Sequence, residues 1–311
     1  MAFRAALHGI PAFAALELSD RPPLLVDPFL TAGSVTLLFG PPSAGKTHLT
    51  VSVACALAHG TPLWGVYPTQ QSRVLIVQAD MNMALYQERI QPNAEALGAN
   101  VAVLITDAIP FDVCKLTPKD PIIEAARGFA PHVIFVDTLR KTHSFDENDS
   151  TAPDRVYAAW RTLFPEAAFV FLHHSRKVST QAASIDTIVR EAFRGSGAWA
   201  ASADTILMLK RVRRANNSAW MTRVHFVRTR SCAEPAPMLL RLNDSLLLEP
   251  FVGSPLEEML LAWITANPRA RRSEAVQWLT SQSKPDGTVL CSQATAYRAW
   301  DRVMKGDAGN G

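Results

Sequence analysis

The chain has 311 residues and a net charge of only +3, and 48% of its residues are hydrophobic. This length favours one large domain with a smaller second one. No uninterrupted apolar run approaches the about 20 residues of a membrane span, and His8, Gly9 and Pro11 interrupt the N-terminal apolar patch, so we expect neither a membrane partner nor a signal peptide. The four cysteines lie far apart without metal or redox spacing, which favours reduced thiols in the cytoplasm.

The first strongly patterned segment covers residues 34–57 and reads SVTLLFGPPSAGKTHLTVSVACAL. The apolar run from Val35 to Phe39 predicts a buried strand, and apolar residues at helical spacing after Lys46 predict a helix that ends at Gly60. Between them, GPPSAGKT has the spacing of a Walker A loop, whose glycines let backbone N–H groups point at phosphates. The alternative is an ordinary strand-turn-helix link, but the flanking strand and helix favour the phosphate loop.

This loop predicts ATP and Mg²⁺ as cofactors. Lys46 is expected to contact the β- and γ-phosphates, and the hydroxyl of Thr47 to hold Mg²⁺. The predicted nucleotide-binding residues are Gly40, Pro41, Pro42, Ser43, Ala44, Gly45, Lys46, Thr47 and His48.

Strands and helices alternate after the Walker A helix. Apolar runs predict strands at residues 73–78, 101–105, 133–136 and 168–172, and the stretches between them predict helices at residues 83–97, 121–129 and 152–164. This alternation predicts an α/β fold with a mostly parallel sheet and helices on both faces. Ligands of such sheets bind outside the carboxyl ends of the strands, so polar residues that follow each apolar run are candidates for chemistry.

Three of these strand ends carry candidate catalytic groups. Asp137 ends the run VIFVD, where a Walker B carboxylate holds Mg²⁺ through water, although an Asp here can also terminate a strand or cap a helix. Asp80 follows VLIVQ and is placed to orient or deprotonate the attacking water, with a helix N-cap as the alternative. His173 and His174 point to opposite strand faces. We expect one of them, His173, to sense the γ-phosphate, with a structural imidazole as the alternative.

Basic residues are concentrated between His173 and Arg230. This segment holds eleven lysines and arginines against three acidic residues. Such an excess of positive charge favours an anionic partner.

Together these motifs resemble the RecA-like P-loop ATPases, and within them the RepA-type hexameric replicative helicases of plasmids and phages. The resemblance runs from about Leu24 to Glu249 and rests on GPPSAGKT, LIVQADM, VIFVDTLRKTHSFDEND, FLHHSRK and FRGSGAWAASADTILML. The family usually has a Glu near Asp80. The resemblance implies a homo-oligomer, a hexameric ring, with ATP hydrolysis at its sites and single-stranded DNA in its channel.

The resemblance also implies roles for basic residues. The family carries Lys-x-Arg on a late strand that reaches into the ATP of the neighbouring subunit, and VHFVRTRS offers Arg228 and Arg230. Spaced by two, they share a strand face, while a charged, solvated edge strand is the alternative. In such rings the link over residues 178–192 faces the channel, with a mobile loop as the alternative. The predicted DNA contacts around it are Arg176, Lys177, Arg190 and Arg194.

Past Pro250 the pattern predicts three short helices. Leu256, Met259, Leu260, Trp263 and Ile264 have the spacing of an amphipathic helix, and SQATAYRAWDRVMK predicts a last helix capped by Ser292. Arg298 and Arg302 are expected to face outward, where they are the predicted DNA contacts of this unit. Three helices of this kind are typical of a helix-turn-helix or winged-helix-like domain that binds duplex DNA or replication proteins. An oligomer-forming module is the alternative because the charge is nearly balanced.

The predicted organisation is an N-terminal arm at residues 1–23, a RecA-like ATPase domain at 24–250, a helix-turn-helix-like domain at 254–305 and a flexible tail at 306–311. The predicted function is an ATP-hydrolysing, ring-forming DNA motor of the RepA-like helicase type. Two alternatives stay open. One is an ATP-dependent DNA-binding regulator without unwinding activity, and the other is an ATP-binding scaffold with little turnover.

Overall fold

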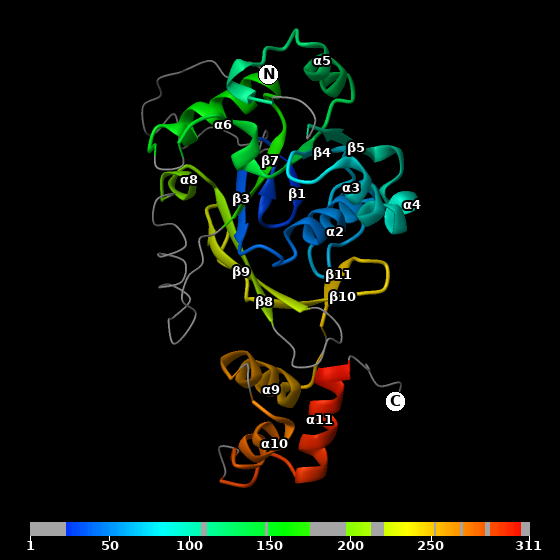
Figure 1. Cartoon of the computed structure of the whole chain (residues 1–311), viewed down its shortest axis with the longest axis vertical. Coiled ribbons are helices and arrows are strands. Elements are labelled where there is room, and N and C mark those ends of the chain that lie inside the picture. The colour runs from blue at the N-terminus through cyan, green and yellow to red at the C-terminus, as the bar shows by residue number, and fades with distance from the viewer. Residues whose placement is uncertain are drawn as a thin grey trace, which may run out of the picture.

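The computed structural model describes residues 23–106, 111–146, 149–174, 197–212, 221–251, 253–267, 270–283 and 287–305. Its centre is a nine-stranded sheet (Figure 1). The strands are β3 (Val35–Gly40), β4 (Val74–Gln78), β5 (Val101–Ile105), β6 (Val133–Asp137), β7 (Ala168–His174), β8 (Thr205–Val212), β9 (Met221–Thr229), β10 (Met238–Leu242) and β11 (Leu248–Pro250). Their order is β11-β10-β9-β8-β3-β7-β6-β4-β5. The strands from β8 to β5 in this order run parallel, while β9, β10 and β11 extend the sheet antiparallel.

Helices cover both faces of the sheet. On one face lie α2 (Lys46–His59), α3 (Met83–Ile90) and α4 (Ala94–Leu97), together with the short hairpin of β1 (Leu24–Val26) and β2 (Leu30–Thr31). On the other face lie α5 (Pro121–Gly128), α6 (Ala152–Leu163) and α8 (Gly197–Ala201). Every residue of β4 and β6 is buried, as expected for parallel strands covered on both sides. The predicted α/β, RecA-like fold class is confirmed.

The helix predicted over residues 83–97 is wrong as a single element. It is split into α3 and α4 by a 3₁₀ turn over Gln91–Asn93. Pro92 lies in this turn and explains the break, because proline has no N–H to donate and its ring clashes with the preceding helical turn.

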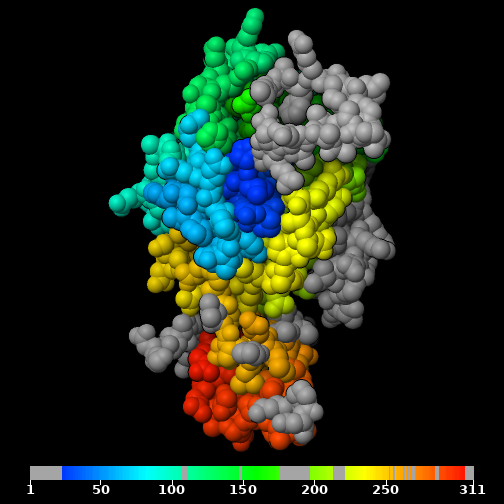
Figure 2. Space-filling model, turned by 180° about the vertical axis from the view of Figure 1, so that it is seen from behind, coloured from blue at the N-terminus to red at the C-terminus, as the bar shows by residue number. Residues whose placement is uncertain are grey.

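The C-terminal region forms a helical unit of α9 (Pro255–Ala266), α10 (Arg272–Thr280) and α11 (Gln293–Lys305). It makes a narrower lobe beside the α/β unit (Figures 1 and 2). Its apolar core also contains Val212 and Met221, which belong to the facing ends of β8 and β9. The two units are therefore joined by shared packing. Residues 1–22 of the predicted arm (residues 1–23) and the tail at 306–311 lie outside the described residues, and the domain boundaries stay predictions.

Arg302 of the last helix is exposed, as the sequence predicted, and it also makes an ion pair within the unit. Its guanidinium pairs with the carboxylate of Glu257 at the start of α9, and Glu257 in turn accepts a hydrogen bond from the backbone N–H of Ser254 at 2.9 Å. Only 8% of the Glu257 side chain is exposed. Arg298 and Arg302 are therefore both exposed as predicted, but only Arg302 has an ion-pair partner among the described residues of the helical unit. Their contact with DNA stays a prediction.

This difference predicts unequal effects on stability. Arg302→Ala should lower the free energy of unfolding by about 2 kcal/mol, since it leaves the Glu257 carboxylate without its charged partner. Arg298→Ala, the matched control on the same helix, should change it by less than about 0.5 kcal/mol. Urea unfolding followed by tryptophan fluorescence measures both, and equal effects would show that the Arg302 pair does not stabilise the unit.

Among the described residues, no helix combines the length and the apolar character needed to cross a lipid bilayer.

Candidate active site

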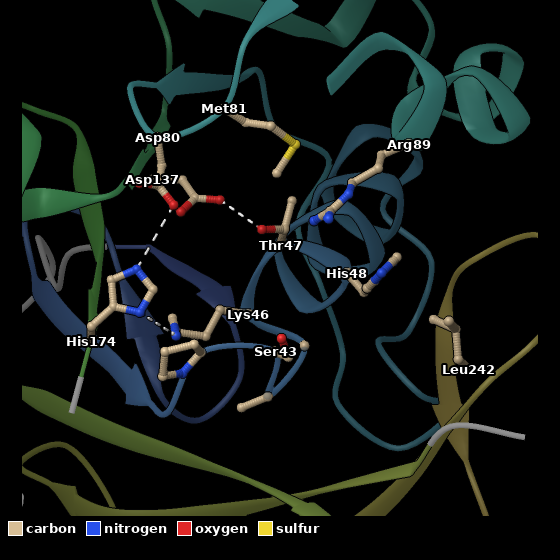
Figure 3. Close-up of a pocket in the computed structure, with 13 residues that line it drawn as sticks. Ser43, Lys46, Thr47, His48, Asp80, Met81, Arg89, Asp137, His174 and Leu242 are labelled. Carbon is tan, nitrogen blue, oxygen red and sulfur yellow. Dashed lines mark hydrogen bonds and ion pairs between the residues drawn. The ribbon is translucent and has the colours of Figure 1, made fainter. Parts of the chain in front are cut away.

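A pocket of about 420 Å³ lies at the carboxyl ends of the central parallel strands, beside the start of α2 (Figure 3). The loop from β3 to α2 forms one wall. The lining residues are Pro42, Ser43, Ala44, Gly45, Lys46, Thr47, His48, Asp80, Met81, Arg89, Asp137, His174 and Leu242. The fold thus brings the Walker A residues together with the ends of β4, β6 and β7, as the sequence predicted for a parallel sheet.

Two glycines permit the loop conformation. Gly45 precedes α2 with a φ of 98°, in the left-handed region. A Cβ atom at Gly40 would lie 2.6 Å from the carbonyl oxygen of Leu209 on β8, so β8 can approach only a residue without a side chain. Both positions therefore require glycine, one for its backbone conformation and one for a close approach.

Lys46 is buried at the base of the pocket. Its ammonium donates to the carbonyl oxygens of Gly40 at 2.9 Å and Pro41 at 3.1 Å, and lies 3.2 Å from Nδ1 of His174. An ammonium only donates hydrogen bonds, so Nδ1 accepts and the proton of a neutral His174 ring is on Nε2. Burial lowers the pKa of Lys46 to about 8, although Asp137 and Asp80 oppose the shift. A cation so poorly solvated is well suited to bind phosphate.

The side-chain oxygens of Thr47 and Asp137 lie next to each other in the pocket. The Thr47 hydroxyl donates to Oδ2 of Asp137 at 2.9 Å, and the Gln78 amide donates to the same oxygen at 3.5 Å. Burial raises the pKa of the Asp137 carboxyl, so a bound cation would stabilise its ionised form.

These oxygens fit Mg²⁺. Hydroxyl and carboxylate groups are hard ligands, and protein-bound Mg²⁺ usually keeps several waters and takes its remaining ligands from substrate phosphates. The described ranges contain no cluster of three or more His, Cys, Asp or Glu that could hold a metal by itself. Thr47 and Asp137 are therefore suited to hold Mg²⁺ jointly with a nucleotide.

Asp80 is not the N-cap of the helix that follows it. Asn82 has that position, since its side chain accepts from the backbone N–H of Leu85 at 2.9 Å. The backbone N–H of Asp80 donates to the Gln78 side chain at 2.8 Å. The Asp80 carboxylate lines the pocket and has Oδ2 at 3.9 Å from Nε2 of His174. The capping alternative is thereby excluded, and the carboxylate remains available for chemistry.

The pocket contains His174 and not His173. Gly40 pairs with His174 across β3 and β7, and the preceding residue His173 pairs with Phe39. Because neighbouring residues on a strand face opposite sides, the His173 ring points away from the pocket. It is buried, its Nδ1 has no hydrogen-bond partner, and burial lowers its pKa to about 4. The choice of His173 is therefore corrected to His174, which links Lys46 to Asp80.

Sequence reasoning missed three lining residues, Met81, Arg89 and Leu242. Arg89 extends from α3 toward the space beside Thr47 and His48 (Figure 3). It makes no ion pair in the described part of the chain. A cation facing a phosphate pocket favours an anionic ligand. No sequence motif marks Arg89, because only the packing of α3 beside α2 brings it there.

Arg228 and Arg230 lie near the amino ends of the parallel strands, at the opposite end of the sheet from the pocket. The Arg228 guanidinium donates to the carbonyl oxygens of Ala200 and Ala203, and Arg230 pairs with Asp204 at 3.2 Å. Because β9 runs antiparallel to β8, its end lies at the amino edge of the parallel strands, opposite the phosphate loop. Neither arginine contributes to the pocket of its own chain. Their role as fingers in a neighbouring subunit stays a prediction.

The DNA contacts predicted at Arg176, Lys177, Arg190 and Arg194 fall within residues 175–196 and lie outside the described residues. They stay predictions.

The fold and the phosphate loop together define a RecA-like P-loop ATPase, a class that binds ATP with Mg²⁺. The AAA domain family (AAA_25) matches residues 12–180, which is more than half of the chain, and the protein therefore belongs to that family. The fold is similar to the ATPase domain of G40P, at 15% sequence identity and a TM-score of 0.51, covering 71% of this chain and 85% of that one. The flagellar accessory protein FlaH from Methanocaldococcus jannaschii matches at 9% identity and a TM-score of 0.47, covering 71% of this chain and 91% of that one.

Proposed function

We propose that this chain hydrolyses ATP in the pocket at α2 and uses the reaction to move on DNA, as a ring-forming replicative helicase of the RepA type. The observation that carries the proposal is the grouping of Lys46, Asp80, Asp137 and His174 around one phosphate loop. A pocket that only bound nucleotide would need the loop and the magnesium ligands. It would not need a carboxylate held beside them without a capping role.

The chain's own residues have distinct tasks in this reaction. Lys46 exchanges its bonds to Gly40, Pro41 and His174 for the phosphates of the nucleotide. Asp80 orients the attacking water or accepts its proton. His174, released from Lys46, keeps its Nε2–H toward Asp80. When bound, Mg²⁺ neutralises developing phosphate charge, and Thr47 with Asp137 would hold it.

The positions of Arg230 and the phosphate pocket at opposite ends of the parallel strands support the proposed ring. Arg230 is exposed at the amino edge, and the phosphate pocket opens at the carboxyl edge. A head-to-tail arrangement would place these different surfaces of neighbouring subunits together, and such heterologous contacts form a ring when the rotation between subunits closes. Each ATP site would then be shared by two subunits.

Mixed rings test this sharing. Adding Arg230→Ala protein to wild type at constant total concentration should lower ATP hydrolysis more steeply than simple dilution, because each defective subunit disables a neighbour's intact site. An arginine finger contributes about 10³- to 10⁵-fold to turnover, so a site without it is effectively silent. Arg161→Ala, an exposed arginine on α6, serves as the control. A linear loss of activity in rings shown to be intact would contradict the shared site.

One observation supports a second candidate, the ATP-binding scaffold. The Asp80 side chain is one methylene shorter than the Glu usual in the family, and it lies 3.9 Å from His174. An ATPase assay with and without single-stranded DNA, coupled to unwinding of a forked duplex, separates the candidates. DNA-stimulated turnover with strand separation supports the motor. Tight ATP binding without turnover supports the scaffold, and sequence-specific duplex binding without unwinding supports a regulator.

A further inference from the structure

A second pocket, of about 350 Å³, lies where the neighbouring parallel strands β4, β6 and β7 begin. It is at the opposite end of these strands from the ATP pocket, and the two pockets share no lining residue. Three of its lining residues are basic, namely Arg73, Arg127 and His132. Arg73 is half-buried and the other two are exposed, so a ligand in solvent can reach all three.

The side chains of Arg73 and His132 are held in place by local hydrogen bonds. Nε of Arg73 donates to the carbonyl oxygen of Ala130 at 2.8 Å, and the backbone N–H of Arg73 donates to Nδ1 of His132 at 3.1 Å. Both bonds join the residue before β4 to the loop before β6. The guanidinium and the imidazole are therefore already ordered before any ligand binds, which lowers the entropic cost of binding.

These two side chains point N–H groups at each other. Nε2 of His132 lies 3.3 Å from Nη2 of Arg73. Burial and the charge of Arg73 lower the pKa of His132, so its ring is neutral at neutral pH, and because Nδ1 accepts, the proton is on Nε2. A guanidinium has no acceptor, so the two groups cannot bond to each other. An anion placed beside them would accept from both.

Arg127 adds a third donor without a counter-charge. It lies in the last turn of α5, and neither Arg127 nor Arg73 makes an ion pair in the part of the chain that the structure describes. Among the described residues that line this pocket, Glu166 is the one acidic residue. The pocket therefore has a net positive charge, and a concave surface with such a charge attracts anions.

The arrangement of the donors indicates a phosphate group. Nε of Arg73 is engaged with Ala130, so the edge that would bind a planar carboxylate through Nε and Nη2 is not available. Donors from three separate segments suit an anion whose oxygens point in several directions. Pro131, Phe164 and Pro165 also line the pocket, and they provide apolar surface for a small organic group attached to the phosphate.

We propose that Arg73, Arg127 and His132 form a binding site for the phosphate group of a small molecule, either inorganic phosphate or a phosphate ester. The site goes beyond the proposed function and does not rest on it, because it uses no residue of the ATP pocket. The strands that begin at this site carry residues of the ATP pocket at their other ends.

The test is equilibrium dialysis of radiolabelled inorganic phosphate against the full chain at constant ionic strength, with saturating ADP and Mg²⁺ to occupy the ATP pocket. Arg127→Gln should weaken phosphate binding at least about tenfold, since a hydrogen bond to a charged group typically contributes that much. Arg161→Gln removes the same charge from an exposed position on α6 outside this pocket. This control should leave phosphate binding nearly unchanged.

A variant with an expected gain separates binding from stability. Glu166→Gln removes the carboxylate from the lining of the pocket and should raise phosphate affinity severalfold, because the carboxylate repels the anion. Loss of structure could not produce such a gain. Unchanged or weaker binding by a folded Glu166→Gln protein would show that the anion does not bind in this pocket.

A third variant tests the imidazole. His132→Asn keeps a side-chain acceptor for the backbone N–H of Arg73 but has no donor at the position of Nε2. It should therefore weaken phosphate binding severalfold while the protein stays folded. Unchanged phosphate affinity in this variant would overturn the assignment of His132.

Competition and the ATP-pocket variant complete the test. If glycerol 3-phosphate displaces phosphate at lower concentration than unlabelled phosphate does, the ligand is a phosphate ester, and equal displacement indicates free phosphate. If acetate displaces it equally well, the pocket binds carboxylates and the inference is wrong. If wild type binds no phosphate, or if Lys46→Ala abolishes binding and Arg127→Gln does not, this second site is overturned and the ATP pocket is unaffected.

Discussion

Lys46→Ala is expected to lower the rate of ATP hydrolysis by about 10²- to 10³-fold, the usual effect of removing one aligned donor from a transition state. The ammonium is buried at the base of the phosphate pocket and is held by two carbonyl oxygens of the loop. Burying this ammonium loses solvation free energy when the chain folds. Its removal should therefore leave the protein folded. Turnover and thermal unfolding, measured on the same preparation, check both parts. Unchanged turnover would remove this pocket as the ATPase site.

The same lysine makes ATP binding depend on pH. The pKa of Lys46 in the protein alone is about 8, and nearby phosphates favour the charged form and raise it. Below pH 8 the lysine is already protonated, so it contributes no pH dependence. As pH rises above 8, binding must take up a proton, and ATP affinity should fall by up to about tenfold per unit. Lys46→Ala should lose this dependence. If ATP affinity falls with pH equally steeply in the variant and in wild type, Lys46 is not its source.

Asp80→Asn should lower turnover by about 10²-fold or more while ATP binding is retained, because the amide cannot accept the proton of the attacking water. Since Asn82 caps α3, the change should leave the free energy of unfolding nearly unaffected. ATP affinity from equilibrium titration and single-turnover hydrolysis give the two quantities separately. Equal hydrolysis by both proteins would assign Asp80 no chemical role.

Asp80→Glu is the matched variant for this test. It restores the carboxylate at the length that the RepA-type family usually has. If the carboxylate acts on the water, Asp80→Glu should hydrolyse ATP at least as fast as wild type, while Asp80→Asn stays slow. Similar losses in both variants would indicate a packing effect and support the scaffold.

The site residues that the sequence predicted are those that lie in or directly after a local pattern of apolar and polar residues. GPPSAGKT, the apolar run before Asp137 and the run before Asp80 each specify a strand and its end within a few residues. In a parallel sheet all carboxyl ends meet at one edge. Lys46, Thr47, Asp80 and Asp137 could therefore be placed together without knowing the strand order.

The remaining parts depend on register and packing. Whether His173 or His174 faces the pocket depends on which of them pairs with Gly40 on β3. The alternation of side chains along a strand does not settle this, because a register shift of one residue exchanges the two faces. Arg89 enters the pocket because α3 packs beside α2. Arg302 finds Glu257 only when α11 crosses the start of α9. Such contacts between distant segments leave no periodic signal in the sequence.

The packing of Val212 and Met221 into the core of α9, α10 and α11 affects any shortened form of the protein. Met221 is fully buried and Val212 is 4% exposed. A chain that ended near Gly253 would expose both on neighbouring strands, next to the half-buried Leu239 and Phe251. Exposed apolar residues on strand ends are a route to aggregation. The helices therefore also act as a cover that keeps the β8–β9 hairpin soluble, and they cannot be removed as a detachable module.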